Sequence, residues 1–520
     1  MSFMVMGKHK NTFDIQLLDD LGVSITRLVS DSRRVKPGDT FLAYVGKEFD
    51  ARKFIPEAIK AGAIAILWEK KNFSWNPEWQ LPAMPITGLK EKTGLIASHV
   101  YGHPSEKLWL VGITGTNGKT SCSHWIAQAM SILNSKTAVI GTLGNGFPGA
   151  LESTINTTPD GVLLQQMIAG YLQQGADSVA IEVSSHGIVQ ERINGAVFSV
   201  AVLTNLSHDH LDYHGSMDAY ATAKAKLFFW PGLKHAVLNL DEVYGVELSR
   251  QLENKDIQII GYGFMQPEMS SGYADNLSIV RGSNLQSNLQ GLSFDVTYQN
   301  ECAHVAIDLI GRFNASNLLA VLSTLLAKGI KFADAVNAIQ KVKPIVGRME
   351  KYGGGELPVV IVDYAHTPDA LEKVLVTLRE VIKHSLSETS SKNDKAKLLC
   401  VIGCGGERDQ AKRKLIGEIA TRLADEVIIT NDNPRNESPQ QIIDAIVSGV
   451  HRHANFSVDA DRASAIYQAI YSAKKGDVVL IAGKGHEEYQ EIKGEKIPFS
   501  DAKIVQETLR ELTAKGVLRS

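Results

Sequence analysis

Residues 108–120 read LWLVGITGTNGKT, an apolar stretch that leads directly into a glycine-rich turn. The apolar part predicts a buried strand, and a helix is expected to begin after the turn. Glycines at 115 and 118 allow backbone N–H groups to surround a phosphate, Lys119 can reach its outer oxygens, and the Thr120 hydroxyl can bind Mg²⁺. This order of strand, loop and helix predicts a parallel α/β sheet with a nucleotide site at its edge.

The loop departs from the strict phosphate-loop motif at one position. That motif has a glycine five positions before Gly118, where this chain has Ile113. A glycine-rich turn that only caps a helix is the alternative, but it gives no role to the adjacent lysine and threonine. The residues therefore predict binding of ATP or GTP without distinguishing between them.

Outward from this loop, apolar strands and amphipathic helices alternate along most of the chain. Residues 257–309 instead show the alternating pattern of antiparallel strands, and residues 313–342 return to helices. A stretch rich in Pro and Gly at 343–358 precedes a second alternating series, in which residues 385–397 are expected to form an exposed loop.

These patterns predict an α/β protein of three domains. The expected domains are a small N-terminal α/β domain (1–105), a central P-loop ATPase-like parallel sheet with added antiparallel strands (106–345), and a Rossmann-like C-terminal domain (346–520).

The composition narrows the class of partner. The 520 residues include 54 Lys and Arg against 57 Asp and Glu, a formal net charge of -3, so no basic excess indicates nucleic-acid binding. No apolar run approaches the roughly 18 residues of a membrane span, and the first residues lack a signal-peptide core. The four cysteines show neither a disulfide framework nor zinc spacing. We expect a cytoplasmic monomer that acts on small molecules, without nucleic acid and without membrane insertion.

Two further strands of the central domain end in residues suited to a metal ion, EVSSHG (182–187) and TNLSHDHLDYHG (204–215). The carboxyl ends of parallel strands meet at one edge of a sheet, so both should lie near the phosphate loop. Mg²⁺ prefers oxygen ligands, which makes Glu182 a stronger candidate than any histidine. Each histidine can equally cap a turn or pair with Asp209 or Asp212. An acid at the end of a buried strand needs a partner, and a metal ion could supply it.

Together with other segments in the same order, these motifs resemble the Mur ligases, ATP-dependent amide-forming enzymes of peptidoglycan precursor synthesis. The segments are GTNGKT (115–120), NTTP (156–159), EVSSHG (182–187), TNLSHDHLDYHG (204–215), YATAK (220–224), GRFNASN (311–317), GRME (347–350), DYAHTPDAL (363–371) and DNPR (432–435). The resemblance implies that ATP phosphorylates a substrate carboxylate and that an amine then attacks the acyl phosphate, which yields an amide, ADP and phosphate.

The resemblance also assigns roles to individual residues. It implies catalytic roles for Lys119, Glu182, Lys224 and His366. It implies ATP contacts for Gly115, Thr116, Asn117, Gly118, Lys119, Thr120, Asn314, Asn317 and Arg348. The implied Mg²⁺ ligands are Thr120, Glu182, His210 and Lys224, the last as a CO₂-derived carbamate that provides an anionic oxygen. Lys226, two residues on, is expected to be an ordinary exposed helix lysine.

Two substrate sites are implied in the same way. The UDP-linked substrate is assigned to Ser30, Ser32, Lys47, Glu48, Phe49, Asn156, Thr157, Thr158, Ser184, Gln190 and Arg192. The amino acid 2,6-diaminopimelate is assigned to Arg408, Asp432, Asn433, Pro434, Arg435, Gly483 and Glu487. From the residues alone, the segment around Ser32 can equally be a solvated turn, and DNPR can be a capping turn before the helix that follows.

In the branch of the family that adds the third residue, DNPR accompanies meso-2,6-diaminopimelate, whose distal carboxylate Arg435 would pair with. The resemblance therefore implies addition of this amino acid to UDP-N-acetylmuramoyl-L-alanyl-D-glutamate. A lysine-adding ligase of the same family is the nearest alternative. Folylpolyglutamate synthetases share the fold, but the NTTP and DNPR segments argue against them. A noncatalytic nucleotide-dependent switch is the alternative from another class, and it leaves Glu182 and Lys224 without a shared purpose.

Overall fold

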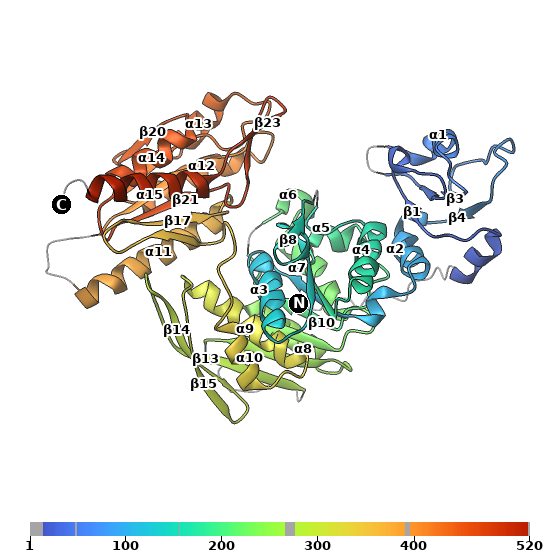
Figure 1. Cartoon of the computed structure of the whole chain (residues 1–520), viewed down its shortest axis with the longest axis horizontal. Helices are drawn as coiled ribbons and strands as arrows, with labels where there is room; N and C mark the ends of the chain where they lie inside the picture. The colour runs from blue at the N-terminus through green and yellow to red at the C-terminus, as the bar shows by residue number, and fades with distance from the viewer. Residues whose placement is uncertain are drawn as a thin grey trace. The chain divides into compact units, whose positions relative to one another are not determined.

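The computed structural model describes residues 14–46, 49–154, 156–207, 209–265, 276–389 and 396–517 (Figure 1). Lys47 and Glu48, two of the predicted substrate-binding residues, lie outside this description. The chain divides into two compact units. The first comprises Met1–Tyr262, Pro267–Ile279 and Ser323–Ile330, and the second comprises Gly263–Gln266, Val280–Leu322 and Lys331–Ser520.

The N-terminal part of the first unit is a small parallel sheet covered on both faces. Its strands, in the order β1-β2-β3-β4, are β1 (Leu28–Val29), β2 (Thr40–Ala43), β3 (Ala65–Glu69) and β4 (Ala83–Ile86). Successive side chains of β2 enter different cores, because Phe41 packs with Ile55 of α1 (Ile55–Lys60) and Leu42 packs with Ile96 of α2 (Leu89–Val100). The small α/β module predicted from the sequence is confirmed.

The larger sheet of this unit has the order β12-β11-β10-β5-β9-β6-β7-β8. Its strands are β5 (Trp109–Thr114), β6 (Thr137–Gly141), β7 (Gly144–Phe147), β8 (Ala150–Glu152), β9 (Ser178–Glu182), β10 (Val200–Leu203), β11 (His235–Asn239) and β12 (Gln258–Gly263). The strands from β12 to β6 are parallel, and β7 and β8 add an antiparallel hairpin. The helices are α3 (Lys119–Ile132), α4 (Gly161–Gln173), α5 (Ser185–Val189), α6 (Leu211–His214), α7 (Met217–Ala225) and α8 (Val243–Leu252).

The register of this sheet aligns the strand ends that carry the predicted motifs. Ile113 of β5 pairs with Glu182 of β9, and Thr114 pairs with Leu203 of β10. The loops that follow these three strands therefore leave the sheet at one edge, as the sequence predicts.

The predicted antiparallel strands come next along the chain, and they belong to the second unit from Val280 on. These are β13 (Leu277–Asn288), β14 (Gly291–Tyr298) and β15 (Glu301–Ile307), paired in that order. The helices α9 (Arg312–Ala327) and α10 (Phe332–Ile339) follow, at the position where the pattern predicts helices.

The C-terminal sheet has the order β16-β17-β21-β18-β19-β20, and all its strands except β16 are parallel. The strands are β16 (Glu350–Gly353), β17 (Val359–Asp363), β18 (Leu398–Ile402), β19 (Glu426–Ile429), β20 (Phe456–Val458) and β21 (Val478–Ala482). The helices are α11 (Pro368–Thr389), α12 (Ala411–Leu423), α13 (Pro439–Val447), α14 (Arg462–Ser472) and α15 (Asp501–Val517).

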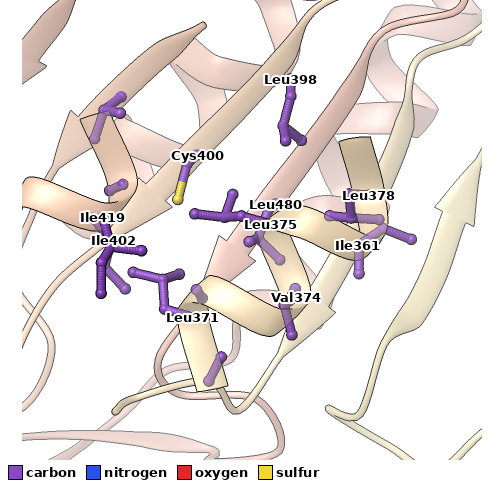
Figure 2. Packing of buried hydrophobic residues seen from close by; sticks show 14 of the residues in the cluster. Ile361, Leu371, Val374, Leu375, Leu378, Leu398, Cys400, Ile402, Ile419 and Leu480 are labelled. Carbon is purple, nitrogen blue, oxygen red and sulfur yellow. The ribbon is translucent and has the colours of Figure 1, made fainter. Parts of the chain in front are cut away.

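Two apolar cores cover the faces of this sheet. On one face Leu371 and Leu375 of α11 pack against Ile361, Cys400 and Leu480 of the central strands, as Figure 2 shows. On the other face, residues of the same strands pack with α14 and α15. The sheet is therefore doubly covered, which confirms the predicted Rossmann-like arrangement and leaves its strand ends as the place for polar residues.

Two local features differ from the sequence-based expectation. α11 continues through Thr389, so residues 385–389 of the predicted loop are helical, and residues 390–395 of that loop lie outside the described residues. A hairpin of β22 (Tyr489–Ile492) and β23 (Glu495–Pro498) was not predicted. Its two-residue turn, Lys493 and Gly494, has φ values of 51° and 80°. A lysine at the first turn position gives a much weaker hairpin signal than the usual asparagine.

Within the described ranges, no helix combines the length and the apolar character needed to cross a membrane.

Candidate active site

The phosphate loop lies between β5 and α3 and is fixed by the loop that follows β10. The Asn117 N–H donates to Oδ1 of Asn205 at 2.9 Å, and the Thr204 hydroxyl donates to the Asn117 carbonyl at 2.6 Å. Gly115 has a φ of 147°, and a Cβ there would overlap the Thr204 hydroxyl, so only glycine fits. Thr204 and Asn205 were missed as site residues, although their position at a strand end was a usable signal.

Lys119 begins α3 and folds back over its own loop. Its Nζ donates to the carbonyls of Gly115 at 2.8 Å and Thr116 at 2.9 Å. The positive end of the helix and this ammonium group therefore lie together at the loop, an arrangement that attracts phosphate. The residue that departs from the strict motif, Ile113, is fully buried within β5.

Glu182 is a fully buried carboxylate at the end of β9. The Thr120 hydroxyl donates to its Oε2 at 3.0 Å. Thr142, just after β6, donates to Oε1 from its backbone N–H at 2.9 Å and to Oε2 from its hydroxyl at 3.0 Å. The protein's own N–H and O–H donors therefore satisfy this buried carboxylate. A metal ion is not needed to offset its burial. Thr142 lies outside all of the motifs, so the sequence analysis did not predict it as a site residue.

Lys224 of α7 is a nearly fully buried amine, with 1% of its surface exposed. Its Nζ donates to the Gly115 carbonyl at 2.8 Å and lies 4.4 Å from the centre of the Tyr220 ring. Burial lowers the pKa of Lys224 well below its ordinary value, the nearby Lys119 lowers it further, and Asp209 opposes the shift. A lysine of this kind holds a neutral, nucleophilic amine at a pH where exposed lysines are charged.

Of the histidines predicted after β9 and β10, His186, His210 and His214 lie close to one another, and His208 lies outside the described residues. The ring centres of His186 and His210 are 4.8 Å apart, and His210 Nε2 is 3.3 Å from Oδ2 of Asp209. His214 Nε2 is 2.9 Å from the Ser185 hydroxyl. Over the ranges that the structure describes, no three His, Cys, Asp or Glu side chains converge as metal ligands. The structure thus joins Thr120 to Glu182, and the place of His210 as a ligand stays a prediction.

Residues predicted to hold the muramoyl dipeptide form one network beside Glu182. The Thr158 hydroxyl donates to the Glu182 carbonyl at 2.8 Å and is 3.0 Å from the Ser184 hydroxyl. Arg192 donates from Nη1 to the Thr158 carbonyl at 2.7 Å and from Nη2 to Oε1 of Gln190 at 2.7 Å. The Thr157 hydroxyl, 3.1 Å from that of Thr142, adjoins the same network, and Asn156 is exposed. Hydrogen bonds thus link five of these predicted residues, Thr157, Thr158, Ser184, Gln190 and Arg192, to Glu182 or to its donor Thr142, directly or through one another.

The N-terminal residues show a capped turn. Asp31 accepts a hydrogen bond from the Arg33 N–H at 3.1 Å and caps a short 3₁₀ helix at Ser32–Arg34. Phe49 is 70% exposed. The geometry agrees with a solvated turn, as the residues alone allowed, and a substrate role for Ser30, Ser32 and Phe49 stays a prediction.

Four residues assigned to ATP or the acyl phosphate lie in the second unit. Asn314 and Asn317 are buried near the start of α9, where Nδ2 of Asn317 is 3.4 Å from Oδ1 of Asn314. The Arg348 guanidinium lies 4.4 Å from the centre of the Tyr364 ring, and the His366 ring lies 4.6 Å from it. Tyr364 therefore brings Arg348 and His366 together.

His486 packs on the same Tyr364 ring, with 5.1 Å between ring centres. Burial, with the charges of Arg348 and Lys484, lowers the pKa of His486 to about 4. The imidazole is therefore neutral at physiological pH. His486 and Tyr364 were both missed, although Tyr364 lies within DYAHTPDAL and His486 lies between the predicted residues Gly483 and Glu487.

The loops after β19 and β21 meet in a buried polar cluster. Lys484, fully buried, donates from Nζ to Oδ1 of Asn433 and to Oε2 of Glu487, each at 3.0 Å. Nδ2 of Asn433 donates to the same carboxylate oxygen at 2.8 Å. A Cβ at Gly483 would lie 2.8 Å from Oδ2 of Asp432. The structure thus joins the two predicted segments through Lys484, which was not predicted.

Arg435 reaches the unpredicted hairpin. Its Nε lies 3.2 Å from Oε2 of Glu491, and its Nη1 donates to the Gly406 carbonyl at 2.6 Å. The N-cap of α13 is Ser438, so the alternative in which DNPR caps that helix is wrong. Arg408 is exposed on the loop after β18. Convergence of Arg408 with the other residues stays a prediction.

A phosphate loop at the edge of one sheet and a cluster of charged residues at the strand ends of another are features expected of an ATP-dependent ligase. Three family models match the chain: "Mur ligase family, catalytic domain" at residues 24–101, "Mur ligase middle domain" at 113–325, and "Mur ligase, glutamate ligase domain" at 347–485. The chain belongs to the Mur ligase family, which confirms the predicted family and fold class.

Similar proteins agree over nearly the whole chain. A UDP-N-acetylmuramoyl-L-alanyl-D-glutamate--2,6-diaminopimelate ligase of Nitrosomonas europaea is 59% identical, covering 95% of each chain. The ligase of the same name from Chromobacterium violaceum is 49% identical, covering 96% of this chain and 97% of its own. A solved structure of a ligase with this name is 34% identical, with a TM-score of 0.66, and covers 94% of this chain and 95% of its own.

The hydrogen bonds of Glu182 generate a first prediction. Thr142→Val removes the hydroxyl donor but keeps the shape and the backbone N–H. A hydrogen bond to a charged group contributes about 1.5–3 kcal/mol, so kcat/KM for ATP in the ligase reaction should fall about ten- to hundredfold. The control is Thr513→Val, which removes an exposed hydroxyl bonded to the Leu509 carbonyl on α15. An equal loss in both variants would contradict a special role for Thr142.

Proposed function

We propose that this chain adds 2,6-diaminopimelate, as the meso isomer, to UDP-N-acetylmuramoyl-L-alanyl-D-glutamate in peptidoglycan precursor synthesis. The reaction proceeds through an acyl phosphate and releases ADP and phosphate. The observation that carries the proposal is the cluster in which Asn433, Lys484 and Glu487 join the DNPR loop to the loop after β21. Relatives with this activity in their names support it over 95% of the chain.

The charges of this cluster suit an amino acid with more than one carboxylate. Arg435 offers a guanidinium whose side chain is 18% exposed, held by Glu491 and the Gly406 carbonyl. Glu487 offers a carboxylate for an ammonium group. Planar guanidinium groups bind carboxylates through two parallel hydrogen bonds, which an amino acid lacking the distal carboxylate cannot complete. This argument favours diaminopimelate over lysine.

The phosphate loop and its neighbours support ATP as the phosphoryl donor. Lys119 and the start of α3 neutralise phosphate charge, and Asn205 and Thr204 keep the loop in one conformation. Phosphoryl transfer depends on such positioning and charge neutralisation more than on covalent help. Asn314, Asn317, Arg348 and His366 are proposed to contact ATP or the acyl phosphate in the second unit.

The donor set near Glu182 fits Mg²⁺. The Thr120 hydroxyl and the Glu182 carboxylate are oxygen ligands in contact with each other, and a carbamate on Lys224 would add an anionic oxygen. When bound, Mg²⁺ supplies positive charge to the phosphate oxygens. The buried Lys224 amine, its pKa lowered mainly by desolvation, is the form that adds CO₂. We further propose that the protein works as a monomer in the cytoplasm, and that the domain limits lie near residues 105 and 345.

The function is tested by phosphate release from ATP and Mg²⁺ with the UDP-linked dipeptide, in parallel with meso-diaminopimelate and with L-lysine. We expect release with diaminopimelate and little with lysine, because only the former has a carboxylate for Arg435. Release with lysine alone would keep the family and reject the substrate. ATP binding without release in either reaction would favour the nucleotide-switch alternative.

Lys224→Ala, on α7, and Lys226→Ala, just beyond its end, form a matched pair. Lys226 is half-buried at the start of a 3₁₀ helix (Lys226–Phe229), not the exposed helix lysine that was expected. We expect the first to lose activity at least about 100-fold, since one charge-stabilising group is removed at the reacting phosphates. Added small carboxylates should partly restore it by supplying the missing oxygen. Lys226→Ala should remain active, because that lysine is only half-buried. Similar losses in the two variants, or no response to carboxylates, would reject the carbamate.

Arg435→Ala should lower kcat/KM for diaminopimelate by about 1.5–3 kcal/mol, the contribution of a hydrogen bond between charged groups. Its control is Arg422→Ala, which breaks a half-exposed ion pair with Glu372 in the same sheet domain. The control should change little, since exposed pairs contribute about 0–1 kcal/mol. An unchanged kcat/KM in Arg435→Ala would mean that another residue binds the distal carboxylate.

A further inference from the structure

Arg462 carries a fully buried charge beneath the amino-acid site, and none of the predicted roles involves it. The side chains of Arg462 and Asp501 are both 0% exposed. Nε of Arg462 donates to Oδ1 of Asp501, and Nη2 donates to Oδ2, each at 2.7 Å. A buried guanidinium is costly unless its donors are satisfied, and this pair supplies two of the bonds.

The remaining contacts of this guanidinium go to the backbone of both substrate-binding loops. Nη2 also donates to the Ala482 carbonyl at 3.0 Å, and Nη1 donates to the Asn431 carbonyl at 3.3 Å. Ala482 is the last residue of β21 and directly precedes Gly483, and Asn431 directly precedes Asp432. One planar group therefore holds the starting points of the two loops that carry the proposed diaminopimelate contacts.

The position of the pair in the fold makes this clamp rigid. Arg462 is the first residue of α14, and Asp501 is the first residue of α15. A carboxylate at the start of a helix lies at the positive end of the helix dipole, where a negative charge is stabilised. Ile466, one turn further along α14, belongs to the apolar core on this face of the sheet, and Asp432 and Glu487 lie close enough to act on the guanidinium electrostatically.

We infer that Arg462, held by Asp501, is a positioning residue that sets the spacing of the DNPR loop and the loop after β21 and thereby the affinity for the incoming amino acid. This inference rests on the proposed function. A positioning role can be told from a purely structural one, because an ion pair that only stabilises the fold would affect folding but not the KM of one substrate in particular. Lys484 joins the same loops nearer to their tips, whereas Arg462 fixes them at their bases.

The test is Arg462→Lys, which keeps the charge but cannot reach the carboxylate and two carbonyls at once. We expect KM for meso-diaminopimelate to rise at least tenfold, while KM for ATP and for the UDP-linked dipeptide stay within twofold of the unchanged chain. The control is Ile466→Ala, one turn further along α14, which removes core packing and touches neither loop. It should lower the melting temperature and leave all three KM values within twofold.

Three results would overturn the inference. The first is an unchanged KM for diaminopimelate in folded Arg462→Lys, the second is an equal rise for all three substrates, and the third is the same diaminopimelate-specific rise in Ile466→Ala. If Arg462→Lys does not fold, as judged by circular dichroism, Asp501→Asn is held to the same criteria. A wild-type chain that releases no phosphate with diaminopimelate would instead reject the proposed function, so the two failures are distinguishable.

Discussion

Both large sheets depend on one constraint, that parallel strands end at a common edge and leave their following loops side by side. In the central sheet, the pairing of Ile113 with Glu182 and of Thr114 with Leu203 brings three loops to one place. In the C-terminal sheet, β21 pairs with both β17 and β18, so their ends are adjacent as well. Because the strands are buried on both faces, polar chemistry is confined to these ends.

The same constraint explains how much the sequence could predict. Apolar strands followed by GTNGKT, EVSSHG and TNLSHDH were enough to place Lys119, Glu182 and Thr204 at one edge, because that inference needs only strand direction. The DNPR (432–435) and KGHE (484–487) segments also follow apolar strands, so they too could be placed at one edge of their sheet. The order of motifs along the chain then indicated the family, and the fold class followed from the alternation of strands and helices.

Contacts between residues far apart in sequence could not be predicted in this way. Thr142 bonds a carboxylate 40 residues away, Lys484 bonds Asn433 over 51 residues, and Arg462 meets Asp501 over 39. The local sequence around a threonine or lysine does not indicate a hydrogen-bond partner that is distant in the chain. The hairpin that carries Glu491 was missed because its Lys-Gly turn is a weak signal. The sequence indicates which strand ends matter, and tertiary packing decides which neighbours orient them.

Three nearly or fully buried cations illustrate how packing sorts similar residues into different roles. Arg462 cannot lose its proton, so it stays charged and is matched by the Asp501 carboxylate. Lys484 has the Glu487 carboxylate and an amide oxygen as acceptors. Lys224 instead donates to a backbone carbonyl and is repelled by Lys119, and desolvation lowers its pKa well below the ordinary value. A cation matched by a carboxylate is suited to hold loops in place, whereas an amine that loses its proton is suited to react. The environment of each side chain, more than its type, therefore distinguishes the carboxylate-paired cations of the C-terminal sheet from the lysine beside the phosphate loop, whose pKa burial lowers.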